Sequence, residues 1–320
     1  MMNYLNTYRR YACDINRINE EVQRDPENLV MLAENLINAD YKWITEQILS
    51  SGSKRHAVLL SGPSSSGKTT SAKKLSEEFQ KHGVDVKHVS LDDFYLGKDH
   101  VDKLPNGKPD FESVKALDIP LIKSTMDDLI LKGECLLPQY DFKNSMRSDK
   151  TKELKLTGDS VVIIEGIHTL NPIFSKGKDR NMIVKIYVSV KQGIKDNEDY
   201  VLDDRELRCI RRIVRDSKFR NTNAEHVLDM WDEVIDGEMK YIRPYRYTSD
   251  FTVNTIHIYE PCVLKKPALE RLSLIDESSP LYPVASRLIS SLERFEDIDE
   301  SLIPKNSLIR EFLGGGSYVY

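Results

Sequence analysis

The sequence predicts an α/β fold: a doubly wound parallel sheet with helices on both faces and helical extensions at both ends of the chain. Two observations indicate this fold. From residue 57 onward, short apolar runs alternate with amphipathic segments, as expected where crossover helices cover both faces of parallel strands. A glycine-rich loop of the kind that binds phosphate also lies between the first apolar run and the first amphipathic segment.

The predicted strands occupy residues 57–60, 84–91, 161–164, 184–190 and 251–253. Two helices lie between them: one runs from Thr69 to Gly83, and the other begins after Asp118 and ends at Gly133, since glycine favours the end of a helix. Their inward faces follow helical spacing, with Ala72, Leu75 and Phe79 in the first helix and Leu121, Ile122, Thr125, Met126, Leu129 and Ile130 in the second. The sequence Thr222-Asn-Ala-Glu225 resembles a capping box and predicts the start of a third helix.

Residues 1–52 and 263–320 are predicted to be helical additions to a core at residues 53–262. In the first addition, Asp25 and Pro26 provide a helix cap and a first-turn proline. The apolar residues that follow at helical spacing are Leu29, Leu32, Ala33, Leu36 and Ile37. The second addition is expected to consist of loops, a glycine-rich tail and one helix that bears Val284, Leu288, Leu292 and Phe295.

Composition favours a soluble protein of a reducing compartment. The 46 basic and 51 acidic residues leave a net charge of -5 and form no long charged tail, so charge favours neither a nucleic-acid partner nor a membrane. No stretch approaches the roughly 18 apolar residues of a membrane span. The four cysteines lack a Cys-x-x-Cys pair, which favours reduced thiols that are buried or half-buried. The histidines, including His88 and His168, lack metal-ligand spacing and are predicted to be surface or structural residues. We expect a cytoplasmic protein; the sequence leaves its oligomeric state open, a homo-oligomer included.

Residues 62–69, Gly-Pro-Ser-Ser-Ser-Gly-Lys-Thr, match the pattern G-x-x-x-x-G-K-[ST] in the required setting between a strand and a helix. The glycines let the backbone wrap around phosphates, so that N–H groups and the positive end of the helix face the anion. Lys68 should reach the β- and γ-phosphates, and Thr69 should hold Mg²⁺. The residues expected to contact the nucleotide are Gly62, Ser64, Ser65, Ser66, Gly67, Lys68, Thr69 and Thr70. The predicted fold is therefore that of a P-loop NTPase.

Other residues distinguish among the classes of nucleotide-binding protein. A GTPase would carry a base-reading motif such as Asn-Lys-x-Asp, which is absent, and a large ATPase usually has an apolar strand that ends in Asp-Glu, whereas the strand at 161–164 ends in Glu165-Gly166. Asp92 and Asp93 stand at the end of another predicted strand, followed by two aromatic residues. A kinase needs a carboxylate at this edge of the sheet to accept the proton of the acceptor hydroxyl. The same residue pattern also occurs in strand exits without chemistry.

A helix beginning near residue 204 carries Arg208, Arg212 and Arg215 on one face, and Leu207, Ile210 and Val214 on another. Arginines that arrive from a mobile lid can stabilise the charge on the γ-phosphate oxygens and exclude water. The alternative is a solvated helix in which Asp204 pairs with Arg208. Beside the loop and the carboxylates, we favour an arginine-bearing lid at residues 203–225.

Six segments in this order resemble the uridine kinase and phosphoribulokinase family of P-loop kinases. They are residues 62–70, 90–95 (Ser-Leu-Asp-Asp-Phe-Tyr), 111–118 (Phe-Glu-Ser-Val-Lys-Ala-Leu-Asp), 138–142 (Pro-Gln-Tyr-Asp-Phe), 163–167 (Ile-Ile-Glu-Gly-Ile) and 211–216 (Arg-Arg-Ile-Val-Arg-Asp). Their order and spacing match the family from about residue 57 to residue 255. Each later motif is only moderately specific alone, but six in register are highly specific.

The resemblance implies a role for each matching position. Asp92 would be the catalytic base, acting with Lys68, Arg212 and Arg215, and Glu165 would be a partner of Mg²⁺ or of its water molecules. The acceptor pocket would contain Tyr95, Phe111, Glu112, Tyr140 and Phe142, to which we add Arg147. Arg212, Arg215 and Arg220 would contact phosphates. Aromatic rings can hold a base or sugar between them while Glu112 accepts hydrogen bonds from ribose hydroxyls.

Several positions depart from the family pattern. After the Tyr-Asp-Phe segment the uridine kinases carry Val-Thr-His-Ser-Arg, and Ser145 stands here in place of the base-reading histidine. Met230 stands at the position of a second base reader, a glutamine, while Glu112 replaces an aspartate and Thr222 a lid arginine. Because specificity comes from polar groups that the wrong ligand leaves unpaired, uracil should not be read here as it is in those kinases.

The sequence thus predicts a kinase that uses ATP and Mg²⁺ to phosphorylate a hydroxyl of a small metabolite, with a nucleoside as the favoured acceptor. The choice of ATP over GTP rests on the resemblance. The missing base readers indicate a sugar phosphate or a pantothenate-like acid as the alternative acceptor. A nucleotide-binding regulatory module with little turnover is a further hypothesis, although such a module has no use for an acceptor-side base.

Overall fold

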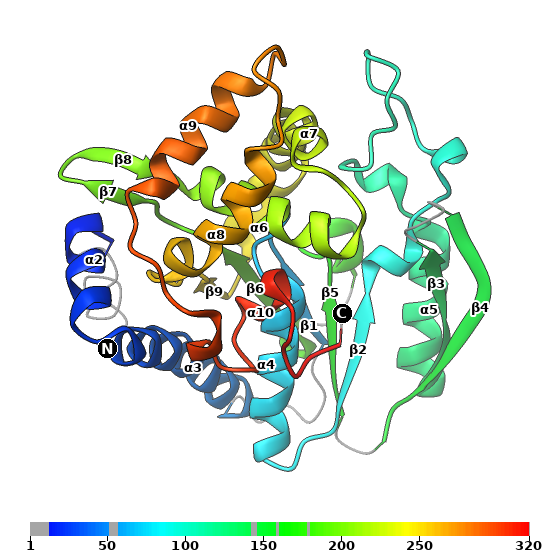
Figure 1. The fold of residues 1–320 in the computed structure, drawn as a ribbon. Helices are drawn as coiled ribbons and strands as arrows, with labels where there is room; N and C mark the ends of the chain where they lie inside the picture. The colour runs from blue at the N-terminus through cyan, green and yellow to red at the C-terminus, as the bar shows by residue number, and fades with distance from the viewer. Residues whose placement is uncertain (1–12, 51–56, 142–145, 158–159, 178–179, 320) are drawn as a thin grey trace.

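A parallel five-stranded sheet forms the centre of the protein (Figure 1). The computed structural model describes residues 13–50, 57–141, 146–157, 160–177 and 180–319. The strands of the sheet are β1 (Ala57–Ser61), β2 (Val86–Ser90), β5 (Val161–Glu165), β6 (Ile183–Ser189) and β9 (Phe251–Asn254). All five fall on the runs predicted from the sequence, and the predicted α/β fold with a parallel sheet is confirmed.

The order of the strands in the sheet differs from their order in the chain. The sheet runs β2-β5-β1-β6-β9, so β5 separates β1 from β2, the strand that follows it in the chain. Ser90 of β2 and Leu60 of β1 are both in register with Glu165 of β5, one from each side. The carboxyl ends of these three strands therefore lie next to one another, at the kind of edge where open α/β sheets bind ligands.

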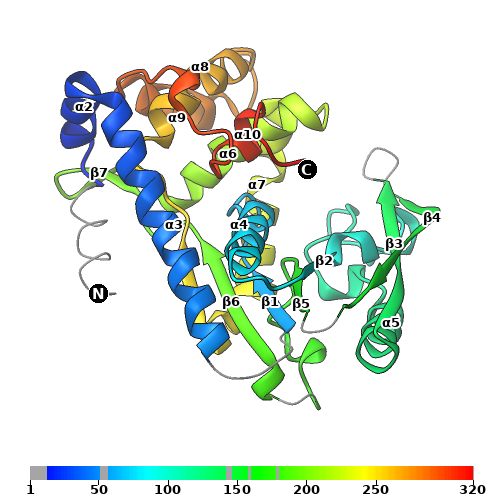
Figure 2. The ribbon, with the colours of Figure 1, turned by 90° about the horizontal axis from the view of Figure 1, so that it is seen from below.

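Each face of the sheet packs against different helices. Side chains alternate along a strand, so Leu60 points to one face and Leu59 to the other. On the first face lie α3 (Pro26–Ser50) and α4 (Lys68–Lys81), which run side by side in Figure 2. On the second face lies α5 (Ile119–Lys132). These three helices match those predicted from residues 25, 69 and 118 onward.

An antiparallel hairpin and α5 together flank the edge strand β2 (Figure 2). The hairpin consists of β3 (Glu134–Asp141) and β4 (Met146–Lys155). It was not predicted, because β4 is rich in charged residues and mostly exposed, and so lacks the alternation that identifies a strand. A second hairpin, β7 (Ile194–Asp196) with β8 (Asp199–Leu202), is too short to give a sequence signal.

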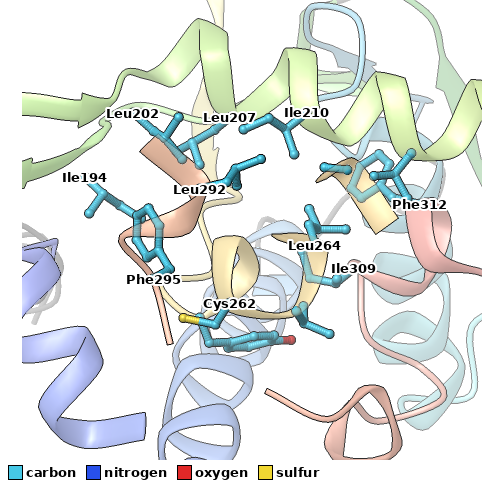
Figure 3. Packing of buried hydrophobic residues seen from close by; sticks show 14 of the residues in the cluster. Ile194, Leu202, Leu207, Ile210, Cys262, Leu264, Leu292, Phe295, Ile309 and Phe312 are labelled. Atoms are coloured by element: carbon cyan, nitrogen blue, oxygen red, sulfur yellow. The ribbon is translucent and has the colours of Figure 1, made fainter. Parts of the chain in front are cut away.

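Helices from distant parts of the chain share one large apolar cluster. Besides the first turns of α3, they are α2 (Ile15–Arg24), α6 (Asp204–Phe219), α7 (Ala224–Gly237), α8 (Glu260–Leu272), α9 (Tyr282–Glu293) and α10 (Arg310–Leu313). Figure 3 shows Ile210 of α6, Leu264 of α8 and Phe312 of α10 within this cluster. Residues from both ends of the chain therefore belong to one apolar cluster, and α7, α8 and α10 pack directly against α6, the helix that carries the predicted arginines.

Short turns connect these elements. They are the π-helical turn η6 (Glu238–Ile242) and the 3₁₀ turns η1 (Leu91–Phe94), η2 (Lys98–His100), η3 (Val114–Ala116), η4 (Pro172–Phe174), η5 (Arg180–Met182), η7 (Arg243–Thr248) and η8 (Glu300–Leu302). Within the described residues, none of the helices combines the length and apolarity needed to cross a lipid bilayer. All four cysteines lie within the described residues and are buried thiols, in agreement with the prediction.

Some details differ from the predicted elements. Asn223, not Thr222, caps α7, and its side chain accepts a hydrogen bond from a backbone N–H three residues on at 2.8 Å. Helix α8 occupies a stretch expected to be a loop and contains Pro267 in its interior. Leu32 and Val284, named from the sequence among the apolar residues of their helices, are 42% and 49% exposed. Propensity and spacing alone thus locate the helices better than their caps or buried faces.

A buried polar cluster ties α3 to the C-terminal part of the chain. The Glu34 carboxylate accepts hydrogen bonds from the hydroxyls of Tyr259 at 2.7 Å and Ser307 at 2.5 Å, and it lies 3.3 Å from the His257 ring. Burial alone would raise its pKa, but the charge of His257 and these hydrogen bonds outweigh burial and lower the pKa of Glu34 to about 2. An ionised carboxylate therefore holds residue 307 against α3.

This cluster predicts an acid-sensitive fold. The pKa of Glu34 falls from its ordinary 4.5 to about 2 on folding, so the unfolded state binds more protons between these values, and the stabilisation is lost as the pH falls through that window. Glu34→Gln should reduce this dependence and lower the free energy of unfolding at neutral pH by about 1–3 kcal/mol, because the buried donors lose a charged acceptor. Urea unfolding from neutral pH to about pH 3 measures both effects. Glu27→Gln, an exposed change in the same helix, is the control; equal acid sensitivity of the two variants would contradict the prediction.

Candidate active site

Residues 62–67 form a tight loop between β1 and α4, in the setting that the motif requires. Ser65 and Gly67 adopt left-handed backbone conformations, with φ of 57° and 82°. A Cβ atom on Gly62 would lie 2.0 Å from the carbonyl oxygen of Val188, and one on Gly67 would lie 2.5 Å from the Leu308 side chain. Both glycines are therefore required by the close approach of neighbouring chain segments.

Side chains of α6 and of the segment after β9 hold the carbonyl groups of this loop. Arg208 Nη1 donates to the Ser64 carbonyl at 3.2 Å, and Arg211 Nη1 donates to the Ser65 carbonyl at 3.3 Å. The next carbonyl accepts from the hydroxyl of Thr255 at 2.8 Å. Because the N–H groups of such a turn point away from its anchored carbonyls, the opposite side of the loop can present N–H groups to an anion.

Arg211 and Glu260 form a fully buried ion pair behind the loop. Both side chains are 0% exposed, and Arg211 Nη2 lies 2.5 Å from Glu260 Oε2. The same guanidinium donates to the Thr255 carbonyl at 2.8 Å and packs over the Phe312 ring at 5.1 Å. Sequence reasoning assigned no role to Glu260, because this pair joins α6 to α8 across 49 positions of sequence.

Breaking this pair should destabilise the protein. Glu260→Ala leaves the Arg211 guanidinium buried without its counterion, and we expect a loss of about 3–5 kcal/mol in the free energy of unfolding. Glu270→Ala in the same helix removes a glutamate whose side chain is 60% exposed and should change stability by no more than about 0.5 kcal/mol. Thermal or urea unfolding compares the two variants, and equal losses would contradict the assigned role of the pair.

Three arginines gather around Asp216 near the end of α6. Arg212, Arg215 and Arg220 place their Nε atoms 3.2, 2.7 and 3.7 Å from its carboxylate. Burial opposes ionisation, but these charges hold the pKa of Asp216 below its usual range. Arg212 also donates to the Ser64 hydroxyl at 3.2 Å. Three cations on one carboxylate leave an excess of positive charge beside the loop.

The predicted arginine face is thus divided. Arg212 and Arg215 join this cluster, whereas Arg208 is 1% exposed and pairs with Glu238 at 2.6 Å. The alternative of a solvated helix with an Asp204 and Arg208 pair is therefore wrong, because Arg208 is buried against the loop.

The two carboxylates after β2 have different surroundings. Asp93 Oδ1 accepts a hydrogen bond from the backbone N–H of Tyr140 at 3.3 Å, which ties η1 to β3, and burial raises the pKa of Asp93. Asp92 is half-buried, and within the described residues no hydrogen bond engages its carboxylate. Asp92 is therefore the carboxylate that remains available for chemistry.

Glu165, at the end of β5, lies close to Asp92. It is 7% exposed and accepts a hydrogen bond from the Ser90 hydroxyl at 2.8 Å. Burial, together with the charge of Asp92, raises the pKa of Glu165 to about 7. Within the described ranges, no group of three or more His, Cys, Asp or Glu side chains forms a metal site. Two crowded carboxylates beside a phosphate-binding loop nevertheless fit a divalent cation that phosphate oxygens and water also coordinate.

Tyr95 lies at the centre of an aromatic wall. Its ring centroid is 5.9 Å from that of Phe111, in an edge-to-face arrangement, and 5.9 Å from that of Tyr140. Its hydroxyl donates to the Phe111 carbonyl at 3.2 Å. The structure therefore brings together three of the aromatic residues predicted for the acceptor pocket, on segments after β2, before α5 and in β3.

Glu112 stands beside this wall and against the end of α7, where a Cβ atom on Gly237 would lie 2.3 Å from the Glu112 Cβ. Burial raises the pKa of Glu112 to about 7, although the charges of Arg212 and Lys68 oppose the shift. His168 is 2% exposed near the Glu112 backbone, and burial lowers its pKa to about 4, so its ring is neutral at pH 7. In the sequence, His168 stands three residues after Glu165, just beyond the end of a predicted strand. This position could have indicated that His168 belongs to the site.

The remaining predicted acceptor residues differ in their surroundings. Arg147 of β4 is in register with Tyr140, and its guanidinium pairs with Asp118, the cap of α5, at 3.0 Å. It therefore ties the hairpin to α5. Phe142 and Ser145 lie outside the described residues. Met230 is half-buried on α7.

The profile of the Phosphoribulokinase / Uridine kinase family matches residues 58–259. The chain belongs to this family. It is therefore a kinase, a phosphotransferase that acts on a hydroxyl group, as the six motifs indicated.

Relatives from several organisms match the same region. The chain is 30% identical over 202 residues to the uridine kinase of Macrococcus caseolyticus, which covers 63% of this chain and 88% of that protein. It is 27% identical over 195 residues to the uridine kinase of Staphylococcus haemolyticus, covering 61% and 84%. Solved structures that it resembles include a possible uridine kinase from Bacillus stearothermophilus (TM-score 0.44, 17% identity, 67% of this chain and 97% of that chain) and D-glycerate 3-kinase from Cryptococcus neoformans (TM-score 0.43, 16% identity, 64% and 89%).

Proposed function

We propose that this kinase transfers the γ-phosphoryl group of ATP to the 5′-hydroxyl of a nucleoside. The observation that carries the proposal is the available carboxylate of Asp92, at the end of β2 and close to Glu165. Its neighbour Asp93 is occupied by the backbone of β3. A carboxylate in this position supports a general base that orients the acceptor hydroxyl and takes its proton during transfer.

The charge that develops on the transferred phosphoryl group needs cations around it. Lys68 lies at the loop, where its Nζ donates to the Pro63 carbonyl at 3.1 Å, and we assign it to the β- and γ-phosphates. Arg212 and Arg215 supply positive charge from α6, and Arg220 joins them as a phosphate contact. Thr69 and Glu165 would hold Mg²⁺, which when bound neutralises charge on the phosphate oxygens.

The proposed acceptor site favours a flat, hydroxylated molecule. Tyr95, Phe111 and Tyr140 offer aromatic surface, Glu112 offers a hydrogen-bond acceptor for ribose hydroxyls, and we retain Phe142 and Arg147 as further candidates. The relatives named uridine kinase support a nucleoside. The apolar Met230 at a base-reading position supports the alternative, a sugar phosphate or a pantothenate-like acid.

A test of this proposal measures Mg²⁺-dependent ADP release from ATP across ribonucleosides, deoxyribonucleosides, sugar phosphates and pantothenate. We expect one nucleoside to accelerate release, and Asp92→Asn to lower kcat by about 10²–10⁴-fold while ATP still binds, because only the proton acceptor is lost. Asp93→Asn is the matched control and should keep most activity, since an amide oxygen can still accept from Tyr140.

Each outcome separates the hypotheses. Acceleration by a sugar phosphate or pantothenate would keep the chemistry and replace the acceptor. If ATP binds and no acceptor raises turnover, the proposed transfer to a small metabolite fails, and a nucleotide-binding regulatory module with little turnover takes its place. Equal activity of Asp92→Asn and Asp93→Asn would remove Asp92 from the role of base.

Glu112 predicts a pH-dependent KM for the acceptor. Its pKa of about 7 means that the carboxylate ionises as the pH rises through neutrality, and only the ionised form accepts hydrogen bonds with both oxygens. KM for a ribose-bearing acceptor should therefore fall from about pH 6 to about pH 8. Glu112→Gln should flatten this dependence, while Glu112→Asp, which keeps a titrating carboxylate, should retain it. A flat KM profile in the unchanged protein would contradict the prediction.

A further inference from the structure

Residues 307–313 lie directly against the phosphate-binding loop, and α10 stands beside the start of α4 in both overall views (Figures 1 and 2). Leu308 packs on Gly67, and Phe312 packs over the Arg211 guanidinium. Leu308 and Phe312 are both 0% exposed and belong to the large apolar cluster that Figure 3 shows in part. This segment is therefore a fixed wall of the nucleotide site.

Between these two anchors, Glu311 places a carboxylate on the first turn of α4. Its Oε2 accepts a hydrogen bond from the Thr70 hydroxyl at 2.6 Å and lies 3.3 Å from the backbone nitrogen of Thr70, which also donates. Glu311 is 8% exposed and Thr70 is 0% exposed. The carboxylate is thus held inside the protein by the hydroxyl and amide of one residue.

The donors that Glu311 occupies are of the kind that a phosphate-binding loop offers to its ligand. Thr70 is the third residue of α4, where backbone N–H groups lack a partner within the helix and attract anions. In loops of this sequence pattern such groups cradle the α- and β-phosphates. A carboxylate oxygen and a phosphate oxygen cannot occupy the same position, and their like charges repel.

We propose that Glu311 is a built-in competitor of the nucleotide phosphates, so that ATP binds when this carboxylate leaves Thr70. The inference rests on the proposed function, because it takes the donor to be a nucleoside triphosphate on this loop. Only the side chain of Glu311 needs to move, since Leu308 and Phe312 anchor the backbone on either side. Lys73, one turn further along α4, attracts the Glu311 carboxylate electrostatically.

Competition of this kind acts on the phosphates and not on the nucleoside. A ligand that places a phosphate on Thr70 must first displace the carboxylate, and the free energy of this displacement lowers its affinity. Adenosine has no phosphate, so its affinity is unaffected. Adenosine and AMP therefore distinguish competition by the side chain from blockage by the whole segment.

The experiment compares Glu311→Gln with the unchanged protein by calorimetric titration with ATP, ADP, AMP and adenosine. Glutamine keeps an oxygen for Thr70 but removes the charge, so Kd for ATP, ADP and AMP should fall by about threefold to tenfold, with no change for adenosine. Glu300→Gln is the matched control. It removes a half-exposed carboxylate of the same part of the chain, which pairs with Arg310 at 2.6 Å, and it should leave all four affinities unchanged.

Three results would overturn the inference. Weaker ATP binding by Glu311→Gln would make Glu311 a positioning residue for Thr70, and unchanged ATP binding would show that its charge does not compete. Tighter binding of adenosine together with ATP would mean that the whole segment competes. Thermal unfolding verifies that the variant folds, and Glu311→Ala repeats the test if it does not. If neither the unchanged protein nor the variants bind ATP, the proposed function fails and takes the inference with it. If the unchanged protein binds and uses ATP, a negative result removes the inference alone.

Discussion

The conformation of the phosphate-binding loop depends on the buried ion pair between Arg211 and Glu260. A buried pair gains little net stability, because both ions lose their hydration, but it fixes a guanidinium whose remaining donors reach the Ser65 carbonyl and Thr255. Arg208 repeats this arrangement with Glu238 and the Ser64 carbonyl. Side chains of α6 therefore fix the conformation of the loop. The carboxylates of α8 and of the turn after α7 in turn fix the positions of these side chains.

Residues of one type have different functions within this site. Of two adjacent aspartates, Asp93 secures a strand and Asp92 stays available. Of the arginines on α6, Arg208 and Arg211 support the loop from behind, whereas Arg212 and Arg215 share Asp216 and leave positive charge beside it. Side chains that hold the backbone are thus separate from side chains that can meet a substrate, and burial is what separates them.

The sequence predicts the features that depend on local pattern. All five strands of the sheet and the P-loop follow from apolar runs and glycine spacing, and the strand exits locate Asp92 and Glu165. Contacts between distant segments leave no such pattern: Glu260 and Glu311 resemble ordinary helix residues until the fold brings them to the loop. The place of His168 in the site and the strand β4 were missed for a related reason. The burial of His168 and the exposure of β4 are both decided by the tertiary structure.

The contact of residues 307–313 with the loop constrains the order in which this protein can mature. Gly67 and Leu308 are among the closest neighbours in the site, yet they are separated by most of the chain. Chains emerge from the ribosome amino end first, so the loop is synthesised long before the segment that packs on it. The nucleotide site can reach its final form only after synthesis has passed residue 313, and its assembly should be a late step of folding with a high contact order.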